Sequence, residues 1–169
     1  MSTREQAVSV RPVTKRDRKF LARLFASTRA EDPAAEQSSE QQREAFLAQQ
    51  FHAQSVRYAE QFPDASFDLV LVDGQPAGQL IVARLVGELK LIDISLLPEH
   101  RGRGIGTALI RPLLDEASEN EARVTIQVER SNRALRLYER LGFVAVENTG
   151  AYLKLERPAA AGRATIASS

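Results

Sequence analysis

The feature that most restricts what this chain can fold into is the segment 94–110, ISLLPEHRGRGIGTALI. A run typical of a buried strand ends at Pro98, and a helical pattern follows. Three glycines separate the two, at positions 102, 104 and 106. Such a turn brings backbone N–H groups and the positive end of a helix to one point, and Arg101 and Arg103 could neutralise an anion there. The segment predicts phosphate or pyrophosphate binding, although an ordinary tight strand-to-helix connection fits it equally well.

Three common nucleotide-binding templates do not fit this segment. A dinucleotide fingerprint needs Gly-x-Gly-x-x-Gly, but the sixth position counted from Gly104 is Leu109. A P-loop needs Gly-Lys-Ser/Thr, whereas Gly106 is followed directly by Thr107. The catalytic-loop and metal-binding motifs of a kinase do not occur downstream.

The rest of the chain alternates between strand and helix patterns. Strands are predicted at 8–13, 67–72, 78–86, 89–97, 124–128, 143–147 and 152–156. Helical periodicity covers 20–25, a long segment that ends at Pro63, about 104–120, and 134–141. Several strands are apolar on both faces, so we expect helices to cover the sheet. This order predicts an α+β domain with a mixed sheet.

Two helix starts carry capping patterns. Thr14 with Asp17 resembles an N-cap before the first helix. Ser38 and Gln41 form the S-x-x-Q pattern of a capping box before the long helix. The apolar face of that helix is predicted from four residues, Leu47, Phe51, Tyr58 and Phe62.

Composition narrows the class of protein. A chain of 169 residues is long enough for one domain with its own core. It has no Cys and two His, which excludes disulfides and thiolate nucleophiles, argues against a metal site and fits a cytoplasmic protein. The net charge of +1 argues against a nucleic-acid or membrane surface. No signal peptide or membrane span is expected, and residues 157–169 are predicted to be a disordered tail.

Two motifs resemble the GCN5-related N-acetyltransferase (GNAT) superfamily. RGRGIG, at 101–106, matches its Arg/Gln-x-x-Gly-x-Gly/Ala motif after the fourth strand. SNRALRLYERLGF, at 131–143, resembles its Asn-x-x-Ala-x-x-x-Tyr-x-x-x-Gly-Phe segment. The element order agrees over about 8–156, so the resemblance implies a single N-acetyltransferase domain at 1–156. It also implies a mostly antiparallel mixed sheet of about seven strands with four helices, splayed between the fourth and fifth strands.

The resemblance implies a set of residues that bind acetyl-CoA. The backbone around Leu96 would pair with the pantetheine arm, and a bulge there would leave an N–H to polarise the thioester carbonyl. The pyrophosphate would be surrounded by Arg101, Gly102, Arg103, Gly104, Gly106 and Thr107. Asn132 matches a position that contacts the cofactor arm, and capping of the following helix is the equal alternative.

The resemblance also implies a general acid but leaves the general base open. Tyr138 matches the tyrosine that protonates the leaving thiolate, against the alternative of packing beside its neighbouring leucines. Some relatives carry a Glu where this chain has Gln127, which cannot be a base. Asp93 and Glu129 are the other candidates.

The expected activity is therefore direct transfer of an acetyl group from acetyl-CoA to a primary amine of a small molecule, a peptide N-terminus or a lysine. The alternative is an acyl-CoA sensor of the same fold that lacks efficient transfer. The expected partners are acetyl-CoA and an amine acceptor, with no nucleic acid, membrane or metal, and the chain is expected to be a monomer or a homodimer.

Overall fold

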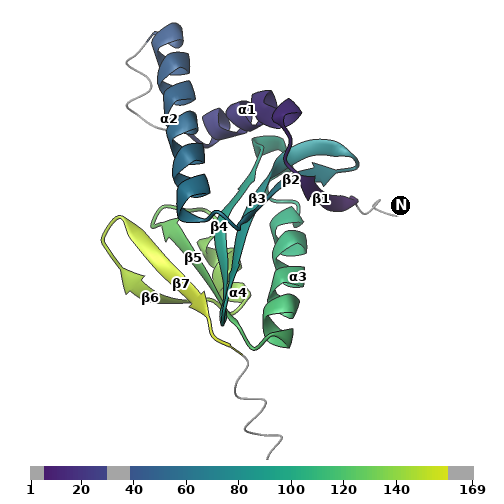
Figure 1. Ribbon diagram of the computed structural model, residues 1–169. Helices are drawn as coiled ribbons and strands as arrows, with labels where there is room; N and C mark the ends of the chain where they lie inside the picture. Colours follow the sequence, from purple (N-terminus) through teal and green to yellow (C-terminus); the bar gives the residue numbers. More distant parts are fainter. Residues whose placement is uncertain (1–5, 30–38, 160–169) are drawn as a thin grey trace, which may run out of the picture. The chain divides into compact units, whose positions relative to one another are not determined.

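A computed structural model describes residues 6–29 and 39–159. In these residues the chain forms seven strands and four α-helices (Figure 1). The strands are β1 Val8–Pro12, β2 Ser66–Val72, β3 Gln75–Leu85, β4 Glu88–Leu96, β5 Arg123–Glu129, β6 Val144–Asn148 and β7 Tyr152–Arg157. The helices are α1 Arg18–Arg29, α2 Glu40–Gln61, α3 Ile105–Glu119 and α4 Leu135–Arg140, with short 3₁₀ turns η1 Lys15–Asp17 and η3 Pro98–His100.

The strands form one mixed sheet in the order β1-β2-β3-β4-β5-β7-β6. β1 pairs with β2, β5 with β7, and β6 with β7, all antiparallel. β4 and β5 are parallel, and their pairing joins Glu88–Leu91 to Arg123–Ile126. The mixed α+β sheet predicted from the sequence is confirmed, whereas the splay between β4 and β5 stays a prediction.

The chain groups into two compact units, and β3 and β4 each contribute to both. Unit 1 comprises Met1–Ile81 and Asp93–Arg103, and unit 2 comprises Val82–Ile92 and Gly104–Ser169. The prediction of a single domain over 1–156 is not tested by this grouping. The predicted C-terminal tail lies outside the described residues from position 160 onward. None of the helices in the described part of the chain has the length and apolar character to span a bilayer.

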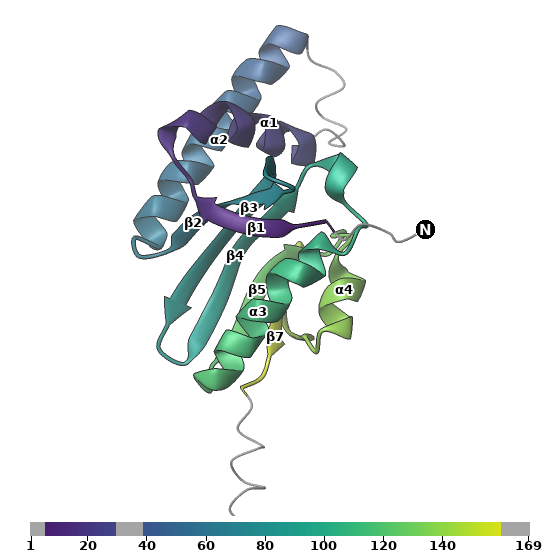
Figure 2. The same ribbon diagram turned by 90° about the vertical axis from the view of Figure 1, so that its right-hand side faces the viewer.

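The core of unit 1 lies between α1 and the sheet (Figure 2). It is built from the buried leucines Leu21, Leu24, Leu69 and Leu97, with Val13, Phe20, Phe51 and Leu71 packed around them. α2 packs on α1 through Phe25 and Phe51, whose ring centroids are 5.7 Å apart. The predicted apolar face of α2 is confirmed, but no residue of this helix is fully buried. Most residues of α2 are exposed to solvent.

Unit 2 is organised around α3 and β5. α3 buries one face, made of Ile105, Leu109, Ile110, Leu113, Leu114 and Ala117. β5 contributes the alternating buried residues Val124, Ile126 and Val128. This packing fixes the start of α3, where the glycine-rich turn enters the helix.

The capping box of α2 lies one residue later than predicted. Ser39, not Ser38, is the N-cap, and its hydroxyl accepts a hydrogen bond from the N–H of Gln42 at 3.2 Å. The Gln42 side chain accepts one from the Ser39 N–H, also at 3.2 Å. The prediction of Ser38 with Gln41 was wrong because SSEQQ contains two overlapping S-x-x-Q patterns, and spacing alone does not distinguish them.

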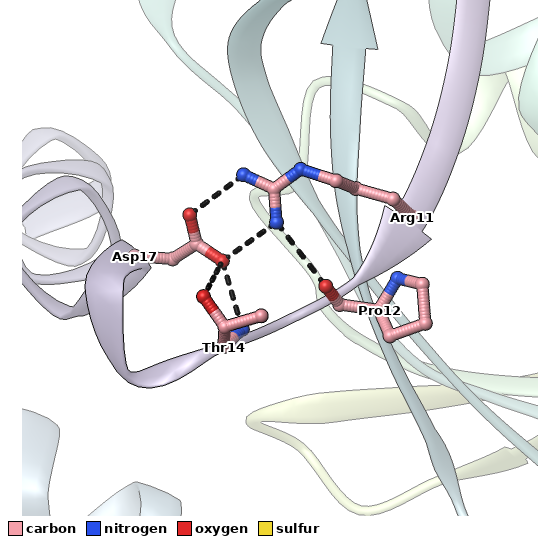
Figure 3. A network of polar contacts seen from close by, with 4 residues as sticks. All are labelled: Arg11, Pro12, Thr14 and Asp17. Carbon is pink, nitrogen blue, oxygen red and sulfur yellow. Dashed lines mark hydrogen bonds and ion pairs between the residues drawn. The ribbon is translucent and has the colours of Figure 1, made fainter.

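A charged network anchors the start of α1 to β1 (Figure 3). The buried carboxylate of Asp17 accepts hydrogen bonds from both terminal nitrogens of Arg11, each at 2.8 Å. It also accepts bonds from the Thr14 N–H at 2.8 Å and from the Thr14 hydroxyl at 3.2 Å. The capping pattern predicted at Thr14 and Asp17 is confirmed, with Arg11 as an additional partner.

The Asp17 network predicts a stability that depends on acidity. The pKa of Asp17 lies well below its usual range, chiefly because of the hydrogen bonds from Arg11 and then because of the one from the Thr14 N–H. Because the folded-state pKa is depressed, the network stabilises the protein fully above about pH 4 and loses this contribution as the pH falls further. We expect Asp17→Asn to lower the urea midpoint at pH 7, with a difference from wild type that shrinks below pH 4. A difference that is constant between pH 7 and pH 2.5 would contradict this assignment.

Candidate functional site

The first part of the glycine-rich turn belongs to unit 1 and folds back on β4. After η3, the exposed Arg101 donates a hydrogen bond from Nε to the carbonyl oxygen of Leu96 at 3.0 Å. Gly102 has a φ of +72°, which favours glycine, and Arg103 is exposed. The structure thus brings two predicted site residues, Leu96 and Arg101, into direct contact.

The second part of the turn belongs to unit 2 and begins α3. Gly104 is the N-cap and has a φ of +79°, and an added Cβ would have nothing within 4 Å. Gly106 differs, because its Cβ would come 3.3 Å from Leu137 Cδ2 of α4. Ile105 is buried and Thr107 is half-buried. The first N–H groups of a helix have no acceptor within the helix, and open space lies where a Cβ of Gly104 would stand, so this end of α3 can receive an anion.

A close approach between β3 and β4 shapes the strand that holds Leu96. The N–H of Leu97 donates to the carbonyl of Ala77 at 2.8 Å. A Cβ added at Gly78 would overlap the carbonyl oxygen of Ser95 and press on Leu96. Sequence reasoning missed Gly78, although an isolated glycine within a strand pattern is a sign of close backbone approach. Gly78 therefore sets the path of the predicted cofactor strand.

Asn132 and Tyr138 lie before and within α4. The Asn132 side chain accepts a hydrogen bond from the Ala134 N–H at 2.7 Å, which fits the predicted capping alternative. Tyr138 is 2% exposed, and its ring meets Phe143 edge-on with centroids 5.7 Å apart. Gly142, with a φ of +94°, follows the end of the helix, and Phe143 is buried. The structure places Tyr138 in this aromatic contact, whereas its role as an acid stays a prediction.

Of the three positions considered for a general base, Asp93 has the distinctive environment. Gln127 and Glu129 on β5 are exposed. Asp93 is half-buried on β4, and its carboxylate accepts a hydrogen bond from the Ser95 hydroxyl at 2.9 Å. Burial raises the pKa of Asp93 to about 6, against the opposing effect of hydrogen bonds from Ser95 and from the Ile94 backbone. A carboxylate with this pKa can exchange a proton near neutral pH.

The charge of this carboxylate acts on a tyrosine of α2, which also belongs to unit 1. Tyr58 is half-buried, and its pKa is raised first by burial and then by the negative charge of Asp93. Sequence reasoning placed Tyr58 only on the apolar face of α2. The signal that could have distinguished it is the single hydroxyl on that face.

The chain is similar to known acetyltransferases. The model of the "Acetyltransferase (GNAT) family" matches residues 23–143. A mycothiol acetyltransferase from Nocardiopsis dassonvillei is 36% identical over 69 residues, which are 41% of this chain and 21% of that protein. A GCN5-like protein acetyltransferase from Mycobacterium tuberculosis is 40% identical over 73 residues, 40% of this chain and 34% of that one. The chain thus spans about a fifth and a third of the length of these two relatives.

Solved structures show the same fold. PaiA N-acetyltransferase from Thermoplasma acidophilum, in complex with coenzyme A, superposes with a TM-score of 0.67 at 18% identity, covering 90% of this chain and 99% of that one. An acetyltransferase from Corynebacterium glutamicum gives a TM-score of 0.64 at 20% identity, covering 90% and 97%. These likenesses establish the fold, and the family model covers most of the chain. The chain belongs to the GNAT family of acetyltransferases.

Proposed function

We propose that this chain is an acetyl-CoA-dependent N-acetyltransferase that passes the acetyl group directly to a primary amine. The observation that carries the proposal is the start of α3, where the N-cap Gly104 has no side-chain cap and open space lies where its Cβ would stand, which suits a pyrophosphate. Gly102, Gly106, Thr107 and the guanidinium of Arg103 complete the residues assigned to that group. The backbone at Leu96 and the side chain of Asn132 are assigned to the cofactor's pantetheine arm.

Two residues of the chain carry out the proton transfers of this reaction. Acetyl-CoA supplies an activated thioester. Asp93 accepts a proton from the ammonium form of the acceptor, so that the neutral amine forms a bond to the acetyl carbon as the carbon–sulfur bond breaks. Tyr138 donates its phenol proton to the departing sulfur, and the proton that the acetylated nitrogen loses restores the phenol. The chain has no Cys, which supports direct transfer rather than an acyl-cysteine intermediate.

Thermal unfolding with CoA ligands and a transfer assay test the function together. Binding to the folded state alone raises the melting temperature, so we expect a rise with acetyl-CoA. Release of free CoA thiol should then appear with members of a panel of primary amines. A rise in melting temperature without thiol release for any amine supports the alternative that the chain is an acyl-CoA sensor. No rise with any CoA compound contradicts both functions.

The assignment of Asp93 predicts opposite effects of one substitution on activity and stability. Asp93→Asn should lower kcat/KM at pH 8 by about 100-fold or more and remove the limb of the pH profile near pH 6. A raised carboxyl pKa means that ionisation in the folded state costs stability, so wild type loses stability relative to the variant as the pH rises from about 4 to 6. We therefore expect the variant to melt higher than wild type at pH 8 and not at pH 4.

Glu129→Gln is the matched control for the Asp93 substitution, because Glu129 is an exposed carboxylate on β5. It should change neither the pH profile nor the melting temperature at pH 8. If the limb near pH 6 persists in Asp93→Asn, then Asp93 is not the base.

A further inference from the structure

The carboxylate of Asp93 shares one face of β4 with a serine hydroxyl. Residues two apart on a strand point to the same side of the sheet, and Asp93 and Ser95 are both half-buried there. The Ser95 hydroxyl donates a hydrogen bond to Oδ1 of Asp93 at 2.9 Å. The hydroxyl therefore holds one oxygen of the carboxylate and fixes the direction in which the other, Oδ2, points.

The backbone that carries Ser95 is itself held by β3, within unit 1. A Cβ at Gly78 would overlap the carbonyl oxygen of Ser95, so the two strands approach more closely here than a side chain at position 78 would allow. Two residues further along the chain, the N–H of Leu97 donates to the carbonyl of Ala77 at 2.8 Å. These contacts leave the Ser95 peptide little freedom to move, and its hydroxyl reaches Asp93 from a fixed base.

A hydroxyl beside a proton-accepting carboxylate affects its titration as well as its direction. Burial raises the pKa of Asp93 to about 6, and the hydrogen bond from Ser95 opposes this rise because it favours the ionised form. Tyr58 of α2 has its own pKa raised by burial and then by the charge of Asp93. The phenol therefore stays neutral over the pH range in which the carboxyl group titrates.

We propose that Ser95 is the positioning residue of the general base, and that its hydroxyl holds Oδ1 of Asp93 so that Oδ2 receives the proton of the acceptor amine. This inference rests on the proposed transfer function and on the role of Asp93 in it. The ammonium group gives its proton to Oδ2 and becomes the neutral nucleophile, and the carboxyl group returns that proton to water after the product leaves. Ser95 acts on the reaction only through Asp93.

A substitution series at Ser95 tests the proposal with an amine that wild type acetylates and with saturating acetyl-CoA. Ser95→Ala should lower kcat at pH 8 about tenfold or more, since a misdirected base slows proton transfer. The limb of the pH profile near pH 6 should move to higher pH, because the lost hydrogen bond favoured the ionised carboxylate. Ser95→Thr keeps a hydroxyl and should restore both quantities. In the background of Asp93→Asn, Ser95→Ala should lower kcat no further.

Ser27→Ala is the matched control for the loss of a serine hydroxyl. Ser27, on α1, is also half-buried, and its hydroxyl donates to the Leu24 carbonyl at 2.7 Å. This variant should keep the wild-type kcat and pH profile. A carbon NMR titration of the Asp93 carboxyl group needs no acceptor, and it should give a higher pKa in Ser95→Ala than in wild type or Ser27→Ala.

The outcomes separate this inference from the proposed function. A wild-type kcat with an unmoved limb in Ser95→Ala overturns the positioning role and leaves the transferase intact. An equal fold-loss with and without the Asp93 carboxylate does the same, and so does a carboxyl pKa that Ser95→Ala leaves unchanged. A limb near pH 6 that persists in Asp93→Asn overturns the base and this inference with it. Binding of acetyl-CoA without transfer to any amine overturns the transferase as well.

Discussion

Gly104→Val is expected to weaken acetyl-CoA binding about 100-fold or more, equivalent to about 3 kcal/mol, while the chain stays folded. Gly104 occupies the left-handed region at the N-cap of α3, with open space where a side chain would begin. Valine there fills this space at the start of the helix, to which the pyrophosphate is assigned. The left-handed conformation also costs a residue with a Cβ about 1–2 kcal/mol of folding stability. Isothermal titration with acetyl-CoA measures the first effect, and urea unfolding measures the second.

Gly74→Val separates the two effects of the Gly104 substitution. Gly74 lies in the turn between β2 and β3 with a φ of +80°, and it also has nothing within 4 Å of its missing Cβ. The same substitution there carries the same backbone strain but is remote in sequence from the glycine-rich turn. We expect Gly74→Val to lose stability and to bind acetyl-CoA as wild type does. Equal affinities of the two variants for acetyl-CoA would show that the pyrophosphate does not bind at the start of α3.

Local patterns in the sequence predicted those parts of the site that neighbouring residues determine. The glycines at 102, 104 and 106 were predicted to lead into a helix, and α3 begins directly after Gly104. Capping of the following helix was one of the two roles expected for Asn132, and its side chain accepts a hydrogen bond from the Ala134 N–H at 2.7 Å. In each case the signal and the structure lie within one turn of helix, so spacing and residue type were sufficient.

Contacts between distant segments could not be predicted in this way. The need for glycine at position 78 depends on how closely the β4 backbone passes it at Ser95. The direction of the Asp93 side chain depends on strand register, which the sequence left open, and its effect on the pKa of Tyr58 joins β4 to α2, two segments that are far apart in the sequence. These relations arise from tertiary packing, and no periodicity in either segment encodes them.

Tyr138→Phe is expected to lower kcat about 100-fold with little change in the affinity for CoA, because a positioned general acid contributes about 10²–10⁴-fold. The phenyl ring that remains can keep its edge-on contact with Phe143 at 5.7 Å, so the core around α4 keeps its packing. Removal of the hydroxyl should cost no more than about 1 kcal/mol of stability. Steady-state kinetics, titration with CoA and urea unfolding measure the three quantities on the same preparation.

Tyr152→Phe serves as the matched control, because Tyr152 lies on β7 with 42% of its surface exposed, and it should retain the wild-type kcat. The leaving group gives a second test of the acid. A thioester whose thiol has a lower pKa needs less protonation as the carbon–sulfur bond breaks, so Tyr138→Phe should lose less activity with such a donor than with acetyl-CoA. An equal loss with both donors would show that the hydroxyl positions the substrate, and a kcat equal to that of Tyr152→Phe would show that Tyr138 has no part in the chemical step.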